Sequence, residues 1–176
     1  DEIISTPMTA EPTNTSIKMV GAKVVWGDVA PDNGLLDPKS VRELVTEKTK
    51  AIVVVHYAGM VCDMDEFNIP IIEDAAHALG SKYNRKMIGC NADYTIFSLQ
   101  AIKHMTTVDG GFLTMKDPSQ MDRARRLRWF GLSKNKSRME NDITEVGYKY
   151  AMNNVNATIG LVQMQNIEKL IGSYIN

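Results

Sequence analysis

The sequence has little cysteine, almost no net charge and no long hydrophobic run. Its two cysteines, Cys62 and Cys90, lack the spacing of metal ligands, so we expect two free thiols and a cytoplasmic protein. Twenty Lys and Arg residues balance 21 Asp and Glu residues, which gives no reason to expect binding to nucleic acid or to an anionic membrane surface. No apolar stretch approaches the roughly 18 residues that a membrane-spanning helix needs.

Short β-branched runs that alternate with helical patterns dominate the 176 residues, which are enough for one domain with a sizeable core. The runs are continuously apolar rather than alternating, as is typical of strands buried on both faces. We expect strands at 23–26, 51–55, 69–73, 94–97 and 111–114. The pattern predicts an α/β fold with a mostly parallel sheet flanked by helices.

Two helix starts carry the same signal, a capping aspartate before a proline, at Asp37-Pro38 and Asp117-Pro118. A last helix is expected from about Asn156. The connection between the strands that contain Val55 and Ile71 has only about fifteen residues, whereas a parallel crossover normally needs a dozen or more and usually a helix. Either this connection is unusually tight or residues of a helix are absent at 67–68.

Three polar residues stand where the strands end. Asp74 closes the apolar strand that begins at Ile69, at the carboxyl edge where open α/β sheets bind ligands. Ser98 closes another strand, and Lys103 follows five residues later. A carboxylate, a hydroxyl and an amine are the partners needed by a cofactor with a basic ring nitrogen, a phosphate and an aldehyde, and pyridoxal phosphate is such a cofactor.

Each of these residues also has a plain structural explanation when it is considered alone. Asp74 can cap an Ala-rich helix, Lys103 can be a surface lysine, and Ser98 can be a turn residue. His77 follows Asp74 by three residues and would share its helical face, either against the cofactor ring or as a structural histidine. Lys149 can reach a phosphate, including one across a dimer interface.

In their order and spacing, the motifs resemble the DegT/DnrJ/EryC1/StrS family of pyridoxal-phosphate-dependent nucleotide-sugar aminotransferases. The resemblance covers nearly the whole chain. Its most specific parts are Glu73-Asp74-Ala75-Ala76-His77-Ala78, Phe97-Ser98 followed by Lys103, Asp109-Gly110-Gly111, and Gly147-Tyr148-Lys149-Tyr150 with Asn154 and Gly160.

The resemblance implies a role for each candidate residue. Lys103 would be the Schiff-base lysine that forms an aldimine with the cofactor, and Asp74 would pair with the pyridinium nitrogen. Ser98 would contact the cofactor phosphate, and His77 would lie against the ring or its phenolic oxygen. Lys149 occupies a position where the family often has an Asn that reaches the cofactor phosphate of a neighbouring subunit, which implies a homodimer with shared active sites.

The implied fold is the large domain of fold-type-I enzymes, and the implied domain is a cofactor-binding domain over 1–176, incomplete at both ends. The implied reaction moves an amino group from glutamate to a keto-sugar carried on a nucleotide diphosphate. Two alternatives remain. One is a sugar dehydratase of the same family, in which histidine replaces the lysine; Lys103 argues against it, although His104 is adjacent. The other is a non-catalytic regulatory relative.

The sequence departs from the family pattern at several positions. Val108 stands where glycine is common, Ala10 lies near the position of an aromatic residue, and Lys149 replaces the usual Asn. The family's upstream helix with a Gly-Thr phosphate contact and its small C-terminal domain have no counterpart in these residues.

Overall fold

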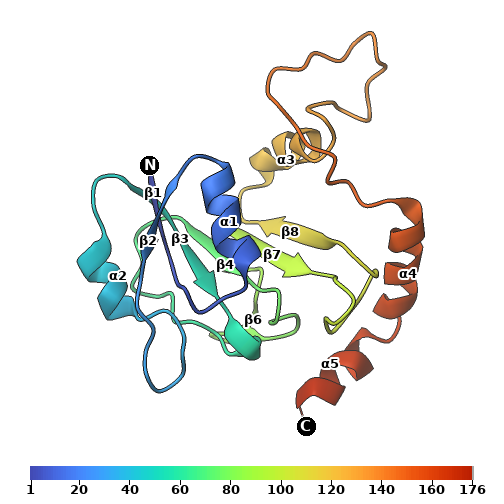
Figure 1. The fold of residues 1–176 in the computed structure, drawn as a ribbon. Helices are drawn as coiled ribbons and strands as arrows, with labels where there is room; N and C mark the ends of the chain where they lie inside the picture. Colours follow the sequence, from blue (N-terminus) through green and yellow to red (C-terminus); the bar gives the residue numbers. More distant parts are fainter. Residues whose placement is uncertain (176) are drawn as a thin grey trace.

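A six-stranded sheet in the order β2-β1-β3-β4-β7-β8 forms the centre of the computed structural model, which describes residues 1–175 (Figure 1). Asn176, the last residue of the expected domain, lies outside the described residues. All neighbouring strands are parallel except β8, which pairs antiparallel with β7. The predicted α/β class with a mostly parallel sheet is confirmed. The strands are β1 (Glu2–Ser5), β2 (Lys23–Trp26), β3 (Thr49–Val55), β4 (Ile71–Asp74), β7 (Tyr94–Ser98) and β8 (Gly111–Met115).

Within residues 1–175, five α-helices lie around this sheet (Figure 1). In Figure 1, α1 crosses in front of the sheet, while α4 and α5 lie beside β7 and β8. Among residues 1–175, no helix combines the length and the apolar character that a bilayer crossing requires. The helices are α1 (Glu11–Met19), α2 (Pro38–Leu44), α3 (Met121–Leu127), α4 (Asn154–Met164) and α5 (Ile167–Ile175).

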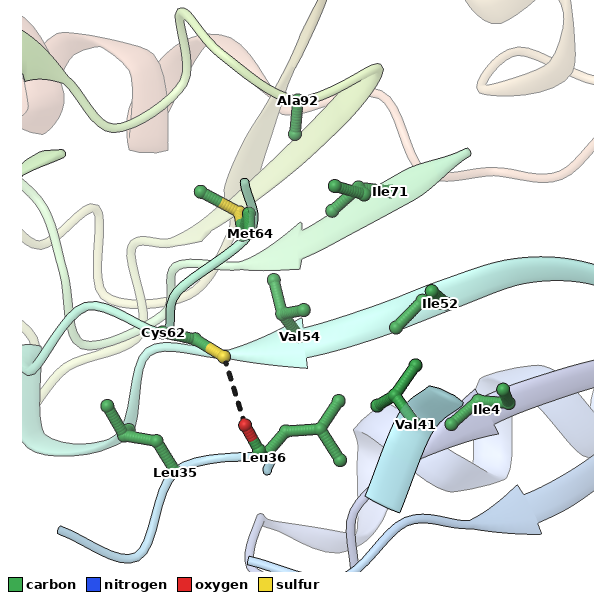
Figure 2. Close-up of a cluster of buried hydrophobic side chains, with 10 residues drawn as sticks. All are labelled: Ile4, Leu35, Leu36, Val41, Ile52, Val54, Cys62, Met64, Ile71 and Ala92. Atoms are coloured by element: carbon green, nitrogen blue, oxygen red, sulfur yellow. Dashed lines mark hydrogen bonds between the residues drawn. The ribbon is translucent and has the colours of Figure 1, made fainter. Parts of the chain in front are cut away.

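The alternation of side chains along β3 explains why its sequence is continuously apolar. Ile52 and Val54 face one side of the sheet, where they pack in a buried cluster with Val41 of α2 (Figure 2). Val53 faces the other side and packs with Ile17 of α1. Because successive residues of a strand point to opposite faces, a strand covered on both sides must be apolar throughout. Each such buried side chain contributes about 1.5–3 kcal/mol.

The start of α2 agrees with its sequence signal, whereas the helical region after Asn153 differs in part from the prediction. The Asp37 carboxylate accepts a bond from the Lys39 N–H at 2.9 Å and caps α2, as expected. The helix expected from about Asn156 begins at Asn154, with the side chain of Asn153 as its cap, but it was wrongly expected to continue as one helix. The chain also turns after α4, so α5 is a separate helix.

The connection from β3 to β4 contains a short 3-10 turn, η1 (Tyr57–Gly59), and no α-helix. Residues 64–67 form only a turn, in which the Phe67 N–H donates to the Met64 carbonyl at 3.2 Å. Met64 and Phe67 still pack against the cluster of Figure 2. Apolar loop side chains therefore cover a part of the sheet over which a crossover helix would normally lie.

One hairpin had no counterpart in the sequence prediction. β5 (Lys82–Tyr83) and β6 (Lys86–Met87) pair antiparallel across a two-residue turn. Asn84 and Arg85 both have positive φ, 47° and 66°, as a type I′ turn requires. Asparagine is common at the first position of such a turn, but the second position usually holds glycine. Because arginine stands there instead, the sequence does not indicate a hairpin.

Candidate active site

Asp74, Ser98 and Lys103 line one cleft at the carboxyl edge of the sheet. Asp74 ends β4 and Ser98 ends β7, and these strands are parallel neighbours, so their last residues meet at the same edge. Lys103 follows in a turn in which its N–H donates to the Gln100 carbonyl at 2.9 Å. The cleft has a volume of about 710 Å³, within the range of small-molecule sites.

The walls of this cleft are mainly apolar. Pro12 and Ile17 of α1 form one side, and Val53 and Ile72 of the sheet form the floor. Ile102 lies next to the lysine at the rim. A few polar groups on an apolar surface are the usual composition of a site that holds a flat organic ligand and excludes water.

The Asp74 carboxylate is held by one donor on each oxygen. The Ala76 N–H donates to Oδ1 at 3.1 Å, and the Thr13 hydroxyl donates to Oδ2 at 2.7 Å. The expected Ala-rich helix after Asp74 is not formed: residues 75–80 are turns. Thr13 was not predicted as a site residue, because it lies 61 residues earlier in α1 and has no distinguishing local pattern.

His77 lies beside the cleft but is not one of the residues that line it. Its Nδ1 accepts a bond from the Ala58 N–H at 3.4 Å, and its ring meets the Tyr57 ring edge-on. Burial lowers the pKa of His77, and the positive charge of Lys103 lowers it further, while the Asp74 carboxylate opposes both effects. A depressed pKa keeps the imidazole neutral near pH 7.

Lys149 is not brought to the cleft of its own chain. It is exposed, its ammonium donates to the Ala151 carbonyl at 3.1 Å, and it lies 5.0 Å from the centre of the Trp129 ring. Of the five residues expected in the site, the structure therefore places three together, one beside them and one elsewhere.

Comparison with known proteins decides the family. The profile of the DegT/DnrJ/EryC1/StrS aminotransferase family matches residues 1–173. The chain belongs to this family.

Several family members resemble the chain closely. It is 40% identical to the UDP-4-amino-4-deoxy-L-arabinose–oxoglutarate aminotransferase of Shewanella sediminis, over 97% of this chain and 47% of that protein. The crystal structure of AtS13 from Actinomadura melliaura has a TM-score of 0.91 at 34% identity, covering 96% of this chain and 49% of that one. Spr1654 of Streptococcus pneumoniae in its PLP form has a TM-score of 0.86 at 33% identity, covering 96% and 50%. The chain thus spans about half the length of the relatives it matches.

The cofactor expected from the sequence, pyridoxal 5'-phosphate, is the cofactor of this family's aminotransferases, and it fits the donor set of the cleft. An amine on Lys103 suits its aldehyde, the Asp74 carboxylate suits its ring nitrogen, and the Ser98 hydroxyl suits its phosphate. Among the described residues that line the cleft, Lys103 is the only Lys or Arg.

One of the departures from the family pattern lines the cleft, and another lies in the turn before β8. Ala10 lines the cleft directly before α1, where it presents a single methyl group in place of an aromatic ring. Val108 has a φ of 73° in the turn that leads into β8. A β-branched residue in this left-handed region is strained, and glycine, which is common at this position in the family, would not be.

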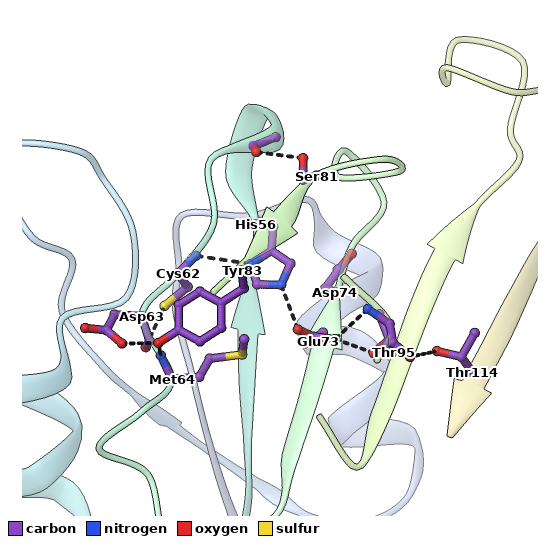
Figure 3. A network of polar contacts seen from close by, with 12 residues as sticks. His56, Cys62, Asp63, Met64, Glu73, Asp74, Ser81, Tyr83, Thr95 and Thr114 are labelled. Carbon is purple, nitrogen blue, oxygen red and sulfur yellow. Dashed lines mark hydrogen bonds and ion pairs between the residues drawn. The ribbon is translucent and has the colours of Figure 1, made fainter. Parts of the chain in front are cut away.

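A buried polar network lies next to Asp74 (Figure 3). Glu73 has no exposed surface, and its carboxylate accepts bonds from His56 Nε2 at 3.3 Å, from the Thr95 hydroxyl and from the Gly89 N–H at 3.3 Å. Burial raises the pKa of Glu73, but these hydrogen bonds outweigh burial and hold it below 4.5. The network ties β3, β4 and β7 together directly beneath the carboxyl edge.

The geometry around His56 fixes its tautomer. The Cys62 N–H donates to His56 Nδ1 at 3.2 Å, so Nδ1 carries no proton. Nε2 therefore carries the single ring proton and donates it to Glu73 (Figure 3). A neutral histidine and an ionised glutamate form this pair, with no free buried donor on the ring.

Proposed function

We propose that residues 1–176 are the cofactor-binding large domain of an aminotransferase that moves an amino group from glutamate to a keto-sugar carried on a nucleotide diphosphate. The observation that carries this proposal is the meeting of Asp74, Ser98 and Lys103 in one apolar cleft. The name of the Shewanella relative supports the substrates, because it pairs an amino sugar on UDP with oxoglutarate, the keto acid that glutamate becomes.

Lys103 carries the covalent chemistry. Its amine would hold the cofactor through the cofactor's aldehyde until the amine of the donor takes its place. The free Lys103 amine would accept the proton from the α-carbon of the donor and, as its conjugate acid, would return that proton to the cofactor. Pyridoxal phosphate, when bound, supplies an electron sink that stabilises negative charge on the substrate carbon.

The remaining residues hold the cofactor and set its charge. The Asp74 carboxylate keeps the ring nitrogen protonated, which favours delocalisation of negative charge into the ring. The Ser98 hydroxyl donates to the phosphate, and neutral His77 lies against the ring or its phenolic oxygen. The apolar walls exclude water, which strengthens these polar contacts.

We also propose a homodimer in which Lys149 reaches the cofactor phosphate of the neighbouring subunit. Lys149 is exposed and is not among the residues that line the cleft of its own chain, which leaves it free to serve another subunit. Mixing inactive Lys103→Ala and Lys149→Ala chains tests this, because a mixed dimer regains one intact site. Mixtures no more active than the separate variants would contradict it. The cytoplasmic location stays a prediction.

Borohydride trapping tests the assignment of Lys103. Reduction of the purified protein with pyridoxal phosphate should leave a stable adduct on the peptide that contains Lys103. Lys103→Ala should abolish it, whereas Lys116→Ala, at an exposed lysine outside the cleft, should not. An adduct that persists on the Lys103→Ala protein would overturn the assignment.

The amino transfer itself is tested by mass spectrometry. Incubation with glutamate and a panel of nucleotide-linked keto-sugars should yield one amino sugar and an equal amount of oxoglutarate. Formation of a dehydrated sugar would favour the dehydratase, and no product with any donor or sugar would favour a non-catalytic relative.

A further inference from the structure

A chain of two threonine hydroxyls ends on the Asp74 carboxylate. Thr13, the third residue of α1, donates to Asp74 Oδ2 at 2.7 Å. Thr9, in the segment before the helix, lies with its hydroxyl oxygen 2.9 Å from that of Thr13. Both side chains are only partly exposed, and Thr13 lines the cleft.

The direction of these bonds follows from the proton count. A hydroxyl has one proton, and an ionised carboxylate only accepts, so the proton of Thr13 is committed to Asp74. At the contact between the two threonines, Thr13 must therefore accept and Thr9 must donate. Hydrogen bonds aligned head to tail polarise one another, so Thr9 strengthens the bond that Thr13 makes.

These bonds fix the plane of the carboxylate. Ala76 N–H occupies one lone pair of Oδ1, and Thr13 occupies one of Oδ2, which leaves each oxygen one lone pair for a ligand in the cleft. Thr13 stands on a helix, and Ala76 follows a strand. A carboxylate held by donors from two separate elements is already fixed before a ligand binds. Binding therefore does not have to include the entropy cost of ordering this side chain.

We propose that Thr13, supported by Thr9, is a positioning residue that orients Asp74 toward the ring nitrogen of the cofactor. This inference rests on the proposed function, because it assigns Thr13 a role through Asp74. It differs from a merely structural role, in which the bond would only attach α1 to the sheet. A bond with only that structural role would change the folding stability and leave the protonation of a bound cofactor ring unchanged.

Two substitutions at one position separate the roles. Thr13→Val keeps the branched shape and removes the hydroxyl, whereas Thr13→Ser keeps the hydroxyl. Loss of a hydrogen bond to a charged group should weaken binding of pyridoxal phosphate about ten-fold in the Thr13→Val protein, measured by titration of its absorbance. With cofactor labelled with 15N in the ring, the nitrogen resonance should move toward the neutral pyridine position. Thr13→Ser should restore both properties.

Thr15 supplies the matched control. It lies on the same helix, is exposed, and donates only to the Glu11 carbonyl at 2.7 Å, so Thr15→Val should match wild type in both measurements. Thr9→Val should move affinity and resonance in the same direction as Thr13→Val, by less. The double variant should be no worse than Thr13→Val alone, because Thr9 acts through Thr13.

The outcomes distinguish this inference from the proposed function. If wild type binds no pyridoxal phosphate, both fail. If wild type binds it and Thr13→Val has the same affinity and the same 15N resonance, only the role of Thr13 is overturned. The Thr13→Val protein could instead unfold at a lower urea concentration while the 15N resonance of the bound ring is unchanged. The bond would then only attach α1 to the sheet, and the inference would be overturned.

Discussion

Replacing Glu73 with glutamine should destabilise the protein although it changes only one atom. In the native network, one carboxylate oxygen accepts from His56 Nε2, and the other accepts from the Thr95 hydroxyl and the Gly89 N–H. A glutamine offers one acceptor and one NH₂ donor in the same space. Whichever way its amide is turned, the NH₂ group faces at least one of these donors.

The size of the effect follows from counting the unpaired donors. If the amide oxygen faces Thr95 and Gly89, the NH₂ group meets the Nε2–H of His56. His56 cannot change tautomer to accept, because its Nδ1 already accepts from the Cys62 N–H. In the opposite orientation, the Thr95 hydroxyl can rotate but the Gly89 N–H loses its partner. At least one donor is left unpaired in each case, at a cost of about 1–3 kcal/mol, so we expect a loss of about 2 kcal/mol.

Urea unfolding at pH 7 measures this loss, and Glu47→Gln, at an exposed position, is the control and should change stability by less than about 0.5 kcal/mol. The pH dependence supplies a second check. Because the folded-state pKa of Glu73 is below 4.5, its contribution is complete above the unfolded value and is lost as the pH falls through the folded value. The gap between wild type and Glu73→Gln should therefore be constant from pH 6 to 8 and shrink below about pH 4.5.

Equal stabilities at pH 7 would refute this reasoning. So would a gap that stays the same at low pH, because it would place the cost in packing rather than in the ionised carboxylate.

Three further predictions concern other groups. Burial raises the pKa of Cys62 to about 12, so a thiol reagent at pH 8 should modify only exposed Cys90 until denaturant is added; rapid modification of two thiols would contradict this. In the cofactor-free protein, His77 should titrate below 6.5 by NMR, and Lys103→Met should raise its pKa because a positive charge is removed; an unchanged value would place Lys103 farther away. Gly147→Ala would bring a methyl group to 2.0 Å from a backbone nitrogen of the facing segment and should cost about 1–3 kcal/mol; an unaltered thermal midpoint would show that the loop yields freely.

The central strand β3 was predictable from sequence because it is buried on both faces. The continuous run from Ala51 to Val55 leaves no polar residue that a solvent-exposed face would require. Asp74, Ser98 and Lys103 were predictable for a related reason. Each follows such a run closely, and parallel neighbouring strands bring their carboxyl ends together.

What the sequence could not predict depends on long-range contacts. Thr13 meets Asp74 across 61 residues, and an ordinary threonine in a helix gives no sign of such a partner. The Ala-rich segment after Asp74 favours a helix locally, but its backbone bonds instead into turns, with the Ala75 N–H donating to the Ile96 carbonyl of β7. Tertiary hydrogen bonding therefore overrides local propensity at the residues closest to the site.

The one-sided placement of the cleft has a practical consequence for protein engineering. Its polar groups stand at the carboxyl ends of β4 and β7, while the turn at 46–48 enters β3 from the opposite end of the sheet. Lys48 in that turn is exposed and is not among the residues that line the cleft. A fluorophore or an immobilisation handle attached there would sit at the opposite end of the sheet from Asp74 and Ser98, so the protein can be tethered to a sensor surface with the cleft open to the solution.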